Sequence, residues 1–198
     1  MIGIERRSIK LNKEIMDEAI QLSKKYDNIN MGGPSDINFI YNAVRLLNAK
    51  KVIETGVAYG WSSLAILNAF YENNGGLLYS VDMPYPKRNN ENYIGVVVPE
   101  RFRKYWKIID RPDVVGIPLA IKLIGGQIDV CHYDSDKSAQ GRDYAYPILW
   151  DALKKGGLFI SDDIGDNLSF SKFAETLGAP FCVIHVKGKQ YIGAIRKI

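Results

Sequence analysis

Apolar residues recur with two different periods along the chain, and the change of period divides it. Before about residue 50 they are spaced as on one face of a helix, once after Asn12 and again after Ser35, with Gly32-Gly33-Pro34 between the two stretches. We therefore expect two helices within residues 1–50, capped by Asn12 and Ser35 and flanking a sheet.

From residue 51 onward, short runs rich in β-branched and aromatic residues alternate with helical patterns. These runs are Val52–Glu54, Leu77–Asp82, Lys107–Asp110, Ile128–Asp134, Leu158–Asp162 and Phe181–Val186. Such alternation is typical of parallel sheets, whose neighbouring strands need a crossover connection. Only Lys187-Gly188-Lys189 separates the last run from Gln190–Ile195, which predicts a β-hairpin. We predict an α/β fold: a Rossmann-like, doubly wound seven-stranded sheet, mostly parallel, with an antiparallel C-terminal hairpin strand.

One long irregular stretch interrupts the alternation. Residues 83–99 follow a strand end, where α/β proteins place their ligand crevice, so we expect a lid there. A length of 198 residues, without repeats or linkers, predicts a single domain over residues 1–198.

The amino-acid composition indicates which class of protein this is. The chain is 46% hydrophobic and 24% charged, as in soluble globular proteins. Its apolar runs are shorter than the roughly 18 residues of a membrane span, and its N-terminus lacks the apolar segment of a secretory signal. We expect a cytoplasmic protein without a membrane partner. The net charge of +4 is mild and scattered, so we expect no nucleic-acid partner either. The oligomeric state stays open, a homo-oligomer included.

A glycine-containing turn joins the first predicted strand to the next helix. Within residues 54–63, Gly56 and Gly60 permit a sharp turn and a close approach to a ligand. Ser62 and Ser63 can cap the following helix, whose free N–H groups attract an anion. The following strand ends in Asp82, where a carboxylate can accept both hydroxyls of a ribose. Together these features indicate a ligand that contains adenosine. The turn is not G-x-G-x-x-G, which disfavours a dinucleotide.

Carboxylates also follow two later strands. Asp134 ends one, and Asp162 and Asp163 end the next, so the three can converge because neighbouring strands lie about 5 Å apart. Converging carboxylates repel unless a cation neutralises them, and oxygen ligands favour Mg²⁺, Ca²⁺ or Mn²⁺. The alternative is that each Asp only caps a turn. We expect His132 and His185 to be structural core residues, with His132 pointing away from Asp134 by strand alternation.

These motifs resemble those of class I S-adenosylmethionine-dependent methyltransferases, and among them the cation-dependent O-methyltransferases similar to catechol O-methyltransferase. The likeness runs from about Met31 to the C-terminal hairpin. The segment E-T-G-V-A-Y-G-W-S-S is similar to the family's E-x-G-x-x-x-G-x-S turn, Y-D-S-D-K to its D-x-x-K segment and S-D-D to its D-N pair. The longer S-D-D-I-G-D-N also resembles enzymes that methylate sugar hydroxyls in antibiotic assembly, so the acceptor stays open.

The resemblance implies cofactor contacts at matching positions. S-adenosylmethionine would be held at its methionine part by Glu54, Gly56, Gly60 and Ser62 and at its ribose by Asp82, with Gly32 nearby. The family's small residues near the adenine are replaced here by D-R-P-D at 110–113, so the adenine contacts are unassigned.

It also implies a catalytic centre. A divalent cation, Mg²⁺ before Ca²⁺ or Mn²⁺, would be bound by Asp134, Asp162 and Asp163, and Lys137 would be the general base. The family's Asn at the third ligand position is Asp163 here, which makes the site more negative.

The expected function is transfer of a methyl group from S-adenosylmethionine to a hydroxyl of a small-molecule or sugar acceptor, assisted by a divalent cation. One alternative is a nucleotide-dependent oxidoreductase on a similar sheet, which would need a second glycine pattern that the sequence lacks. The other is an inactive cofactor-binding protein, which the retention of Lys137 and the three Asp residues disfavours.

Overall fold

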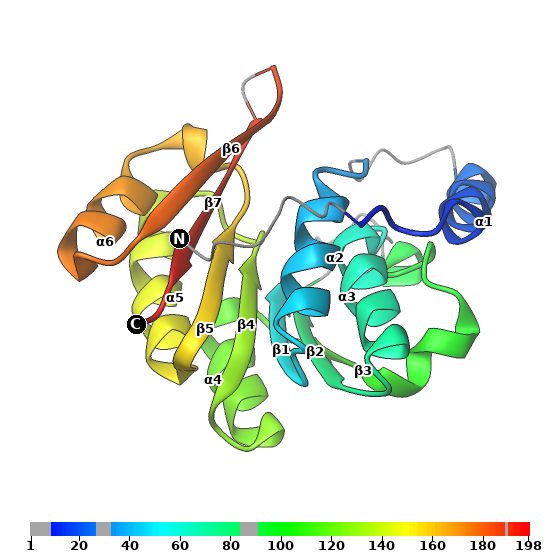
Figure 1. Ribbon diagram of the computed structural model, residues 1–198, viewed down its shortest axis with the longest axis horizontal. Coiled ribbons are helices and arrows are strands. Elements are labelled where there is room, and N and C mark those ends of the chain that lie inside the picture. The colour runs from blue at the N-terminus through cyan, green and yellow to red at the C-terminus, as the bar shows by residue number, and fades with distance from the viewer. Residues whose placement is uncertain (1–8, 27–32, 84–90, 189) are drawn as a thin grey trace.

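The chain is built around a seven-stranded sheet with the order β3-β2-β1-β4-β5-β7-β6. The computed structural model describes residues 9–26, 33–83, 91–188 and 190–198 (Figure 1). The strands are β1 Lys51–Thr55, β2 Leu77–Asp82, β3 Trp106–Asp110, β4 Ile128–Tyr133, β5 Leu153–Ser161, β6 Phe181–Lys187 and β7 Gln190–Arg196. Strand β7 runs antiparallel to both β5 and β6, whereas β1 to β5 pair in parallel. The predicted doubly wound sheet with an antiparallel hairpin strand is confirmed.

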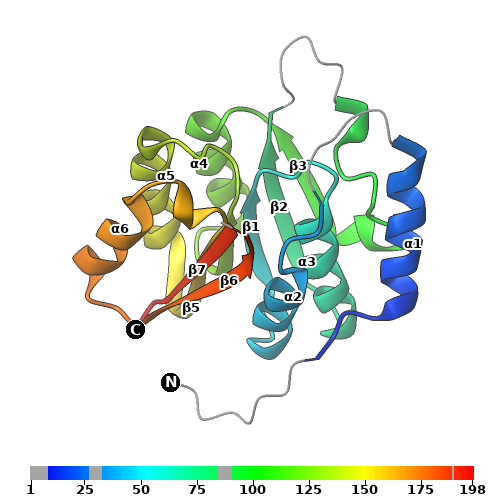
Figure 2. The ribbon, with the colours of Figure 1, turned by 90° about the horizontal axis from the view of Figure 1, so that it is seen from above.

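Helices cover both faces of this sheet, as the view in Figure 2 shows. Helices α1 Lys13–Ser23, α2 Ile37–Leu46 and α3 Trp61–Glu72 lie on one side, and α4 Asp113–Ile124, α5 Ala139–Ala152 and α6 Ser169–Leu177 lie on the other. Short 3-10 turns cover Lys24–Tyr26, Glu91–Tyr93, Glu100–Tyr105 and Ile164–Asp166. None of the described helices is long and apolar enough to cross a membrane.

Two apolar clusters close the two faces, and strand residues alternate between them. Val52 and Val130 belong to the cluster under α2 and α3, whereas their neighbours Ile53 and Cys131 belong to the cluster under α4 and α5. Successive side chains of a strand point to opposite faces, so central strands covered on both faces are apolar throughout. The strand ends are thereby held in register, and their polar residues leave the sheet at fixed positions.

The N-terminal helices form as the sequence predicts, with one change of cap. Asn12 Oδ1 accepts a hydrogen bond from Glu14 N at 2.8 Å, which caps α1. Helix α2 is capped by Asp36, whose Oδ1 accepts from Phe39 N at 3.1 Å, and not by Ser35 as expected. Serine and aspartate are both good N-cap residues, so a shift of one residue is compatible with the predicted helix.

The described part of the insertion at 83–99 packs against the turn after β1. Gly95 N donates to Ala58 O at 2.9 Å, and Val97 N donates to Tyr59 O at 3.1 Å. A Cβ on Gly95 would lie 2.3 Å from the Trp106 ring, so the fit is tight. Residues 91–99 therefore form a wall beside this turn. Residues 84–90 lie outside the described residues, and the lid stays a prediction.

A buried carboxylate ties the amino-terminal ends of three strands together. Asp129, near the start of β4, accepts from Lys50 N at 2.7 Å and Lys51 N at 2.8 Å, and it pairs with the Lys154 ammonium of β5. Burial raises the pKa of Asp129, but the Lys154 hydrogen bond and the two backbone N–H groups outweigh burial, so the pKa falls below its usual value.

We expect Asp129→Asn to lower the free energy of unfolding at pH 7 by about 1–3 kcal/mol, because hydrogen bonds to a charged group are lost. The wild-type pKa is depressed, so this stabilisation is present above about pH 4 and is lost as the pH falls through the folded-state value. Urea unfolding at pH 7 and pH 3 measures both effects. The exposed Asp151→Asn is the matched control, and equal stability of all three proteins at pH 7 would contradict the role of Asp129.

Candidate functional site

The turns that follow β1 and β4 touch one another at the carboxyl edge of the sheet. Asp134 N donates to Thr55 O at 2.9 Å, and the hydroxyls of Ser135 and Thr55 are hydrogen-bonded to each other at 2.9 Å. Gly56 has a φ of +75°, and a Cβ there would lie 2.4 Å from Asp134 O. Only glycine suits both the backbone angle and the close approach. The predicted cofactor turn and the predicted acidic cluster are therefore parts of one region.

Asp82, at the tip of β2, holds this turn from the other side. Its Oδ2 accepts from Val57 N at 2.6 Å and from Ala58 N at 3.0 Å, whereas Oδ1 has no hydrogen-bond partner among the described residues. Burial raises the pKa of Asp82 more than the two N–H groups lower it, and the nearby Glu54 carboxylate adds to the rise. One carboxylate oxygen thus shapes the turn while the other is left for a ligand. Gly32, the other glycine assigned near the cofactor, lies outside the described residues.

The first turn of α3 has no side-chain cap. Its N-cap is Gly60, with a φ of +91°, and no described side chain accepts from its backbone N–H groups there. The prediction that Ser62 and its neighbour cap this helix is wrong, because Ser63 Oγ donates to Glu54 Oε2 at 2.5 Å instead. Ser62 is half-buried beside the turn. Uncapped N–H groups at a helix N-terminus favour an anionic group such as a carboxylate.

Glu54 lies inside the sheet rather than at its edge. Its side chain is fully buried, and Oε2 accepts from Ser63 Oγ at 2.5 Å and from Ser80 Oγ at 2.7 Å. Ser80 Oγ in turn accepts from Trp106 Nε1 at 2.8 Å. The carboxylate therefore contacts the first turn of α3 through Ser63, and the structure does not bring it to the outer surface of the turn.

The acidic residues converge in two linked groups. Carboxylate oxygens of Asp134 and Asp162 and a ring nitrogen of His132 all lie within 4.8 Å of one another. Asp163 is outside this trio, and its Oδ2 lies 3.3 Å from Lys137 Nζ, which also pairs with Asp134 Oδ1. The expectation that His132 points away from Asp134 is wrong, because residues two apart on an extended chain share a face.

Charges in this group strongly influence one another. Burial raises the pKa of Asp134 to about 6, even though the Lys137 ammonium and His132 lower it. Burial lowers the pKa of Lys137, but the Asp134 carboxylate, followed by Asp163 and Asp162, raises it above its usual value. The Lys137 ammonium therefore serves as a cation among the carboxylates. Two carboxylates and an imidazole around one point, with the Asp163 carboxylate nearby at Lys137, are a donor set that fits a divalent ion.

Two residues outside the predicted set position these groups. Arg142 of α5 is fully buried, and its Nη2 donates to Asp162 O at 3.3 Å and Asp163 O at 2.8 Å. Asn167 Nδ2 donates to Lys137 O at 2.8 Å, which ties the turn after β4 to the turn after β5. The sequence gives little signal for Arg142, because a helical arginine is usually exposed. Asn167 lies within the S-D-D-I-G-D-N segment and could have been found there.

His185, the other histidine, is not in the core as expected. It is exposed on β6, and its Nε2 lies 2.9 Å from Gly188 O. Strand β6 is an edge strand of the sheet, so it has a neighbouring strand on one side only.

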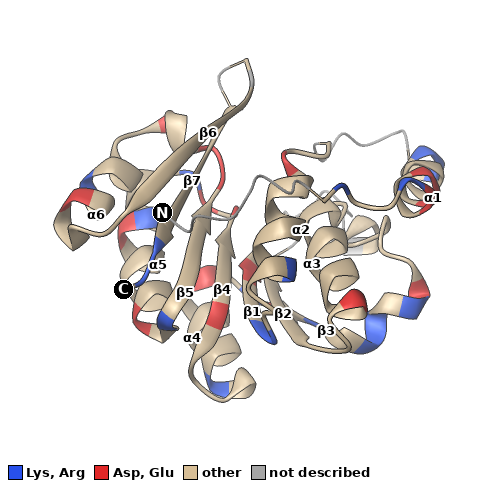
Figure 3. Ribbon diagram, in the orientation of Figure 1, with Lys and Arg blue, Asp and Glu red and all other residues tan. Residues whose placement is uncertain are grey.

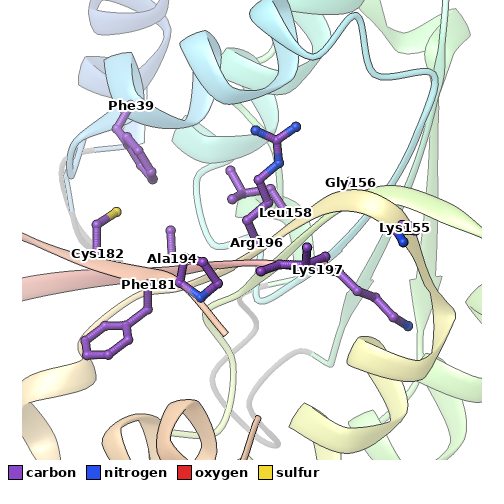
Figure 4. Close-up of a pocket in the computed structure, with 11 residues that line it drawn as sticks. Phe39, Lys155, Gly156, Leu158, Phe181, Cys182, Ala194, Arg196 and Lys197 are labelled. Atoms are coloured by element: carbon purple, nitrogen blue, oxygen red, sulfur yellow. The ribbon is translucent and has the colours of Figure 1, made fainter. Parts of the chain in front are cut away.

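A groove of about 640 Å³ lies elsewhere in the molecule (Figure 4). Its lining includes Phe39 of α2, Leu158 of β5 and Ala194 of β7, and it is mainly apolar. It adjoins the start of β5, whereas Asp162 follows the end of that strand. The groove therefore lies apart from the acidic cluster.

Lys and Arg are distributed over several elements of the described chain and are not gathered in one run (Figure 3).

Solved structures share this fold. The O-methyltransferase of Bacillus cereus, solved with S-adenosylhomocysteine, has a TM-score of 0.72 at 13% identity, over 96% of this chain and 93% of that chain. The O-methyltransferase TomG of Streptomyces achromogenes, involved in tomaymycin synthesis and solved with S-adenosylmethionine, has a TM-score of 0.66 at 14% identity, over 96% and 92%. A methyltransferase of Podospora anserina with bound S-adenosylhomocysteine has a TM-score of 0.67 at 15% identity, over 98% and 92%. At these identities the likeness shows the fold.

The sequence itself matches one family model. No curated protein matches the chain. Residues 53–164, more than half of the chain, match the family described as a methyltransferase domain. This range begins in β1 and ends just after Asp163, so it includes the glycine turn, Asp82 and the acidic cluster. The chain belongs to this methyltransferase family, and its sheet is that of a class I S-adenosylmethionine-dependent methyltransferase.

Proposed function

We propose that the protein transfers a methyl group from S-adenosylmethionine to a hydroxyl of a small-molecule or sugar acceptor, with a divalent cation at the acceptor side. The observation that carries the proposal is the contact between the two turns, in which Gly56 lies against Asp134. It joins a site suited to an adenosine ligand to a site suited to a cation. The O-methyltransferases with bound S-adenosylmethionine or S-adenosylhomocysteine among the structural neighbours support the same reaction.

The residues present fit S-adenosylmethionine. Asp82 Oδ1 is available for ribose hydroxyls, because only Oδ2 is used by the turn. The uncapped first turn of α3, from Gly60 through Ser62, can accept the carboxylate of the methionine part. Gly56 keeps the turn free of a side chain where it meets Asp134. Glu54 would act indirectly, by holding the start of α3 through Ser63.

The acidic cluster fits a divalent cation. Asp134, Asp162 and Asp163 would hold it, and with these oxygen ligands alone we expect Mg²⁺ before Ca²⁺ or Mn²⁺. When bound, the cation supplies Lewis-acid polarisation of an acceptor hydroxyl. Arg142 holds the backbone carbonyls of Asp162 and Asp163, so these two residues are positioned before a ligand arrives.

Lys137 is the proposed general base. Its neutral Nζ would take the proton of the acceptor hydroxyl while the oxygen forms a bond to the methyl carbon and the carbon–sulfur bond breaks, which leaves the uncharged thioether of S-adenosylhomocysteine. The ammonium form cannot accept this proton, and the Asp134 and Asp163 carboxylates favour that form. Once Asp134 and Asp163 held a cation, their carboxylates would no longer stabilise the ammonium form of Lys137.

We expect S-adenosylmethionine to bind at micromolar levels and Asp82→Ala to weaken binding at least about tenfold, which is 1.4 kcal/mol and near the lower end for a hydrogen bond to a charged group. Titration calorimetry measures both affinities, with the exposed Asp151→Ala as the matched control. Unchanged affinity in Asp82→Ala would refute this contact. Tighter binding of NAD than of S-adenosylmethionine would favour the oxidoreductase instead.

Removal of the cation is expected to stop methyl transfer. A panel of hydroxyl-bearing acceptors, read out by S-adenosylhomocysteine release, should lose activity in excess EDTA and regain it with added divalent ion. Asp134→Asn should lose cation binding in calorimetry and keep its affinity for S-adenosylmethionine, since that side chain pairs with Lys137 and lies in the acidic cluster. Full turnover in EDTA would show that the reaction does not need the cation.

Two variants of Lys137 distinguish a general base from a residue that only supplies positive charge. We expect Lys137→Ala and Lys137→Arg both to lower turnover by about 10² to 10⁴, because an arginine keeps the positive charge but does not accept a proton at neutral pH. Affinities for cofactor and cation should change little in the arginine variant. Lys122→Ala, at an exposed position of α4, is the control. Normal turnover of Lys137→Arg would exclude the base role and leave Lys137 as a counter-ion.

A further inference from the structure

His132 is buried, and its ring makes no hydrogen bond to any residue that the structure describes. Its side chain is 1% exposed, and neither Nδ1 nor Nε2 has a partner among the described residues. It lies in β4 between Glu54 of β1 and Ile160 of β5, so its backbone is fixed by strands on both sides. Buried polar nitrogens are nearly always paired, and an unpaired one in a rigid position requires an explanation.

The ring lies between a buried carboxylate and the acidic cluster. Its Nδ1 is 3.7 Å from Glu54 Oε1, which also lacks a hydrogen-bond partner among the described residues. A ring nitrogen also lies within 4.8 Å of ligand oxygens of Asp134 and Asp162. Histidines that bind metals commonly donate the second ring N–H to a carboxylate, which fixes the tautomer and the ring orientation. Glu54 is placed for this task, since Ser63 and Ser80 already hold its other oxygen.

We propose that His132 is a nitrogen ligand of the cation site, with Nδ1–H directed to Glu54 and Nε2 left for the ion. The site then combines one imidazole with the carboxylates of Asp134 and Asp162. It therefore prefers Mn²⁺, Fe²⁺, Co²⁺ or Zn²⁺ to Mg²⁺ and Ca²⁺, which replaces the preference for Mg²⁺ expected of oxygen ligands alone. Imidazole binds first-row transition ions well, whereas Mg²⁺ and Ca²⁺ are bound mainly by oxygen. The inference rests on the cation of the proposed function and not on methyl transfer.

Pulsed electron paramagnetic resonance of the Mn²⁺-loaded protein tests the inference directly. The chain has only two histidines, His132 and the exposed His185, so an imidazole signal can be assigned by removing either one. We expect ¹⁴N coupling from a bound imidazole in the wild type and in His185→Gln, and no such coupling in His132→Asn. A histidine that only packs in the core would give no coupling in any of the three.

Calorimetry on the same proteins adds the ion preference. We expect His132→Asn to weaken Mn²⁺ binding at least about tenfold and Mg²⁺ binding less than about threefold, with His185→Gln unchanged for both ions. If His132→Asn does not fold, the spectra of the wild type and His185→Gln decide alone. Bound Mn²⁺ without ¹⁴N coupling, or Mg²⁺ binding as tight as Mn²⁺, would overturn the inference and leave the carboxylate site intact. Failure of every ion to bind would overturn both the His132 ligand and the cation of the proposed function. Binding of S-adenosylmethionine would still test the methyltransferase function separately.

Discussion

The contact between the chain leaving β1 and the chain leaving β4 is the constraint on which the site depends. Gly56 has no room for a Cβ beside Asp134 O, and the Asp134 amide is bonded to Thr55 O. The two turns can therefore adopt their shapes only together. Parallel pairing of β1 with β4 sets their relative height, and Asp82 fixes the far side of the glycine turn. A methyl donor held by one turn would thus lie next to an acceptor held by the other.

Ionisable groups are buried just beneath this contact. Glu54 and His132 lie opposite each other on neighbouring central strands, and both are buried. Apolar residues at these two positions would contribute more to folding stability than an incompletely bonded pair of ionisable groups. The hydroxyls of Ser63 and Ser80 bond to only one oxygen of the Glu54 carboxylate. Within the described part of the chain, Glu54 Oε1 and the His132 ring therefore have no hydrogen-bond partner. Such local departures from good packing are expected at functional sites. They connect the first turn of α3, through Glu54, with the residues around the acidic cluster.

Strand ends could be predicted from the sequence, whereas side-chain partners could not. Apolar runs fix the register of a parallel sheet, so the positions of Asp82, Asp134 and Asp162 at its carboxyl edge follow from where each run stops. The partner of Ser63 depends on whether its rotamer points to the helix end or back to Glu54, which no local pattern specifies. The burial of Arg142 depends on how α5 packs, and the start of β5 at Leu153 is hidden by the polar residues that follow it. For His132, two-residue spacing from Asp134 does indicate a shared face, so this signal was present in the sequence.

The central claim is that one edge of the sheet holds the methyl donor and a divalent cation side by side. It is tested most directly by ¹³C nuclear magnetic resonance of S-adenosylmethionine labelled at the methyl carbon, bound to the protein and titrated with Mn²⁺, with Mg²⁺ as the diamagnetic reference. The account predicts strong paramagnetic broadening of the bound methyl signal, lost in Asp134→Asn. A methyl signal that stays sharp while calorimetry shows both ligands bound would contradict the account.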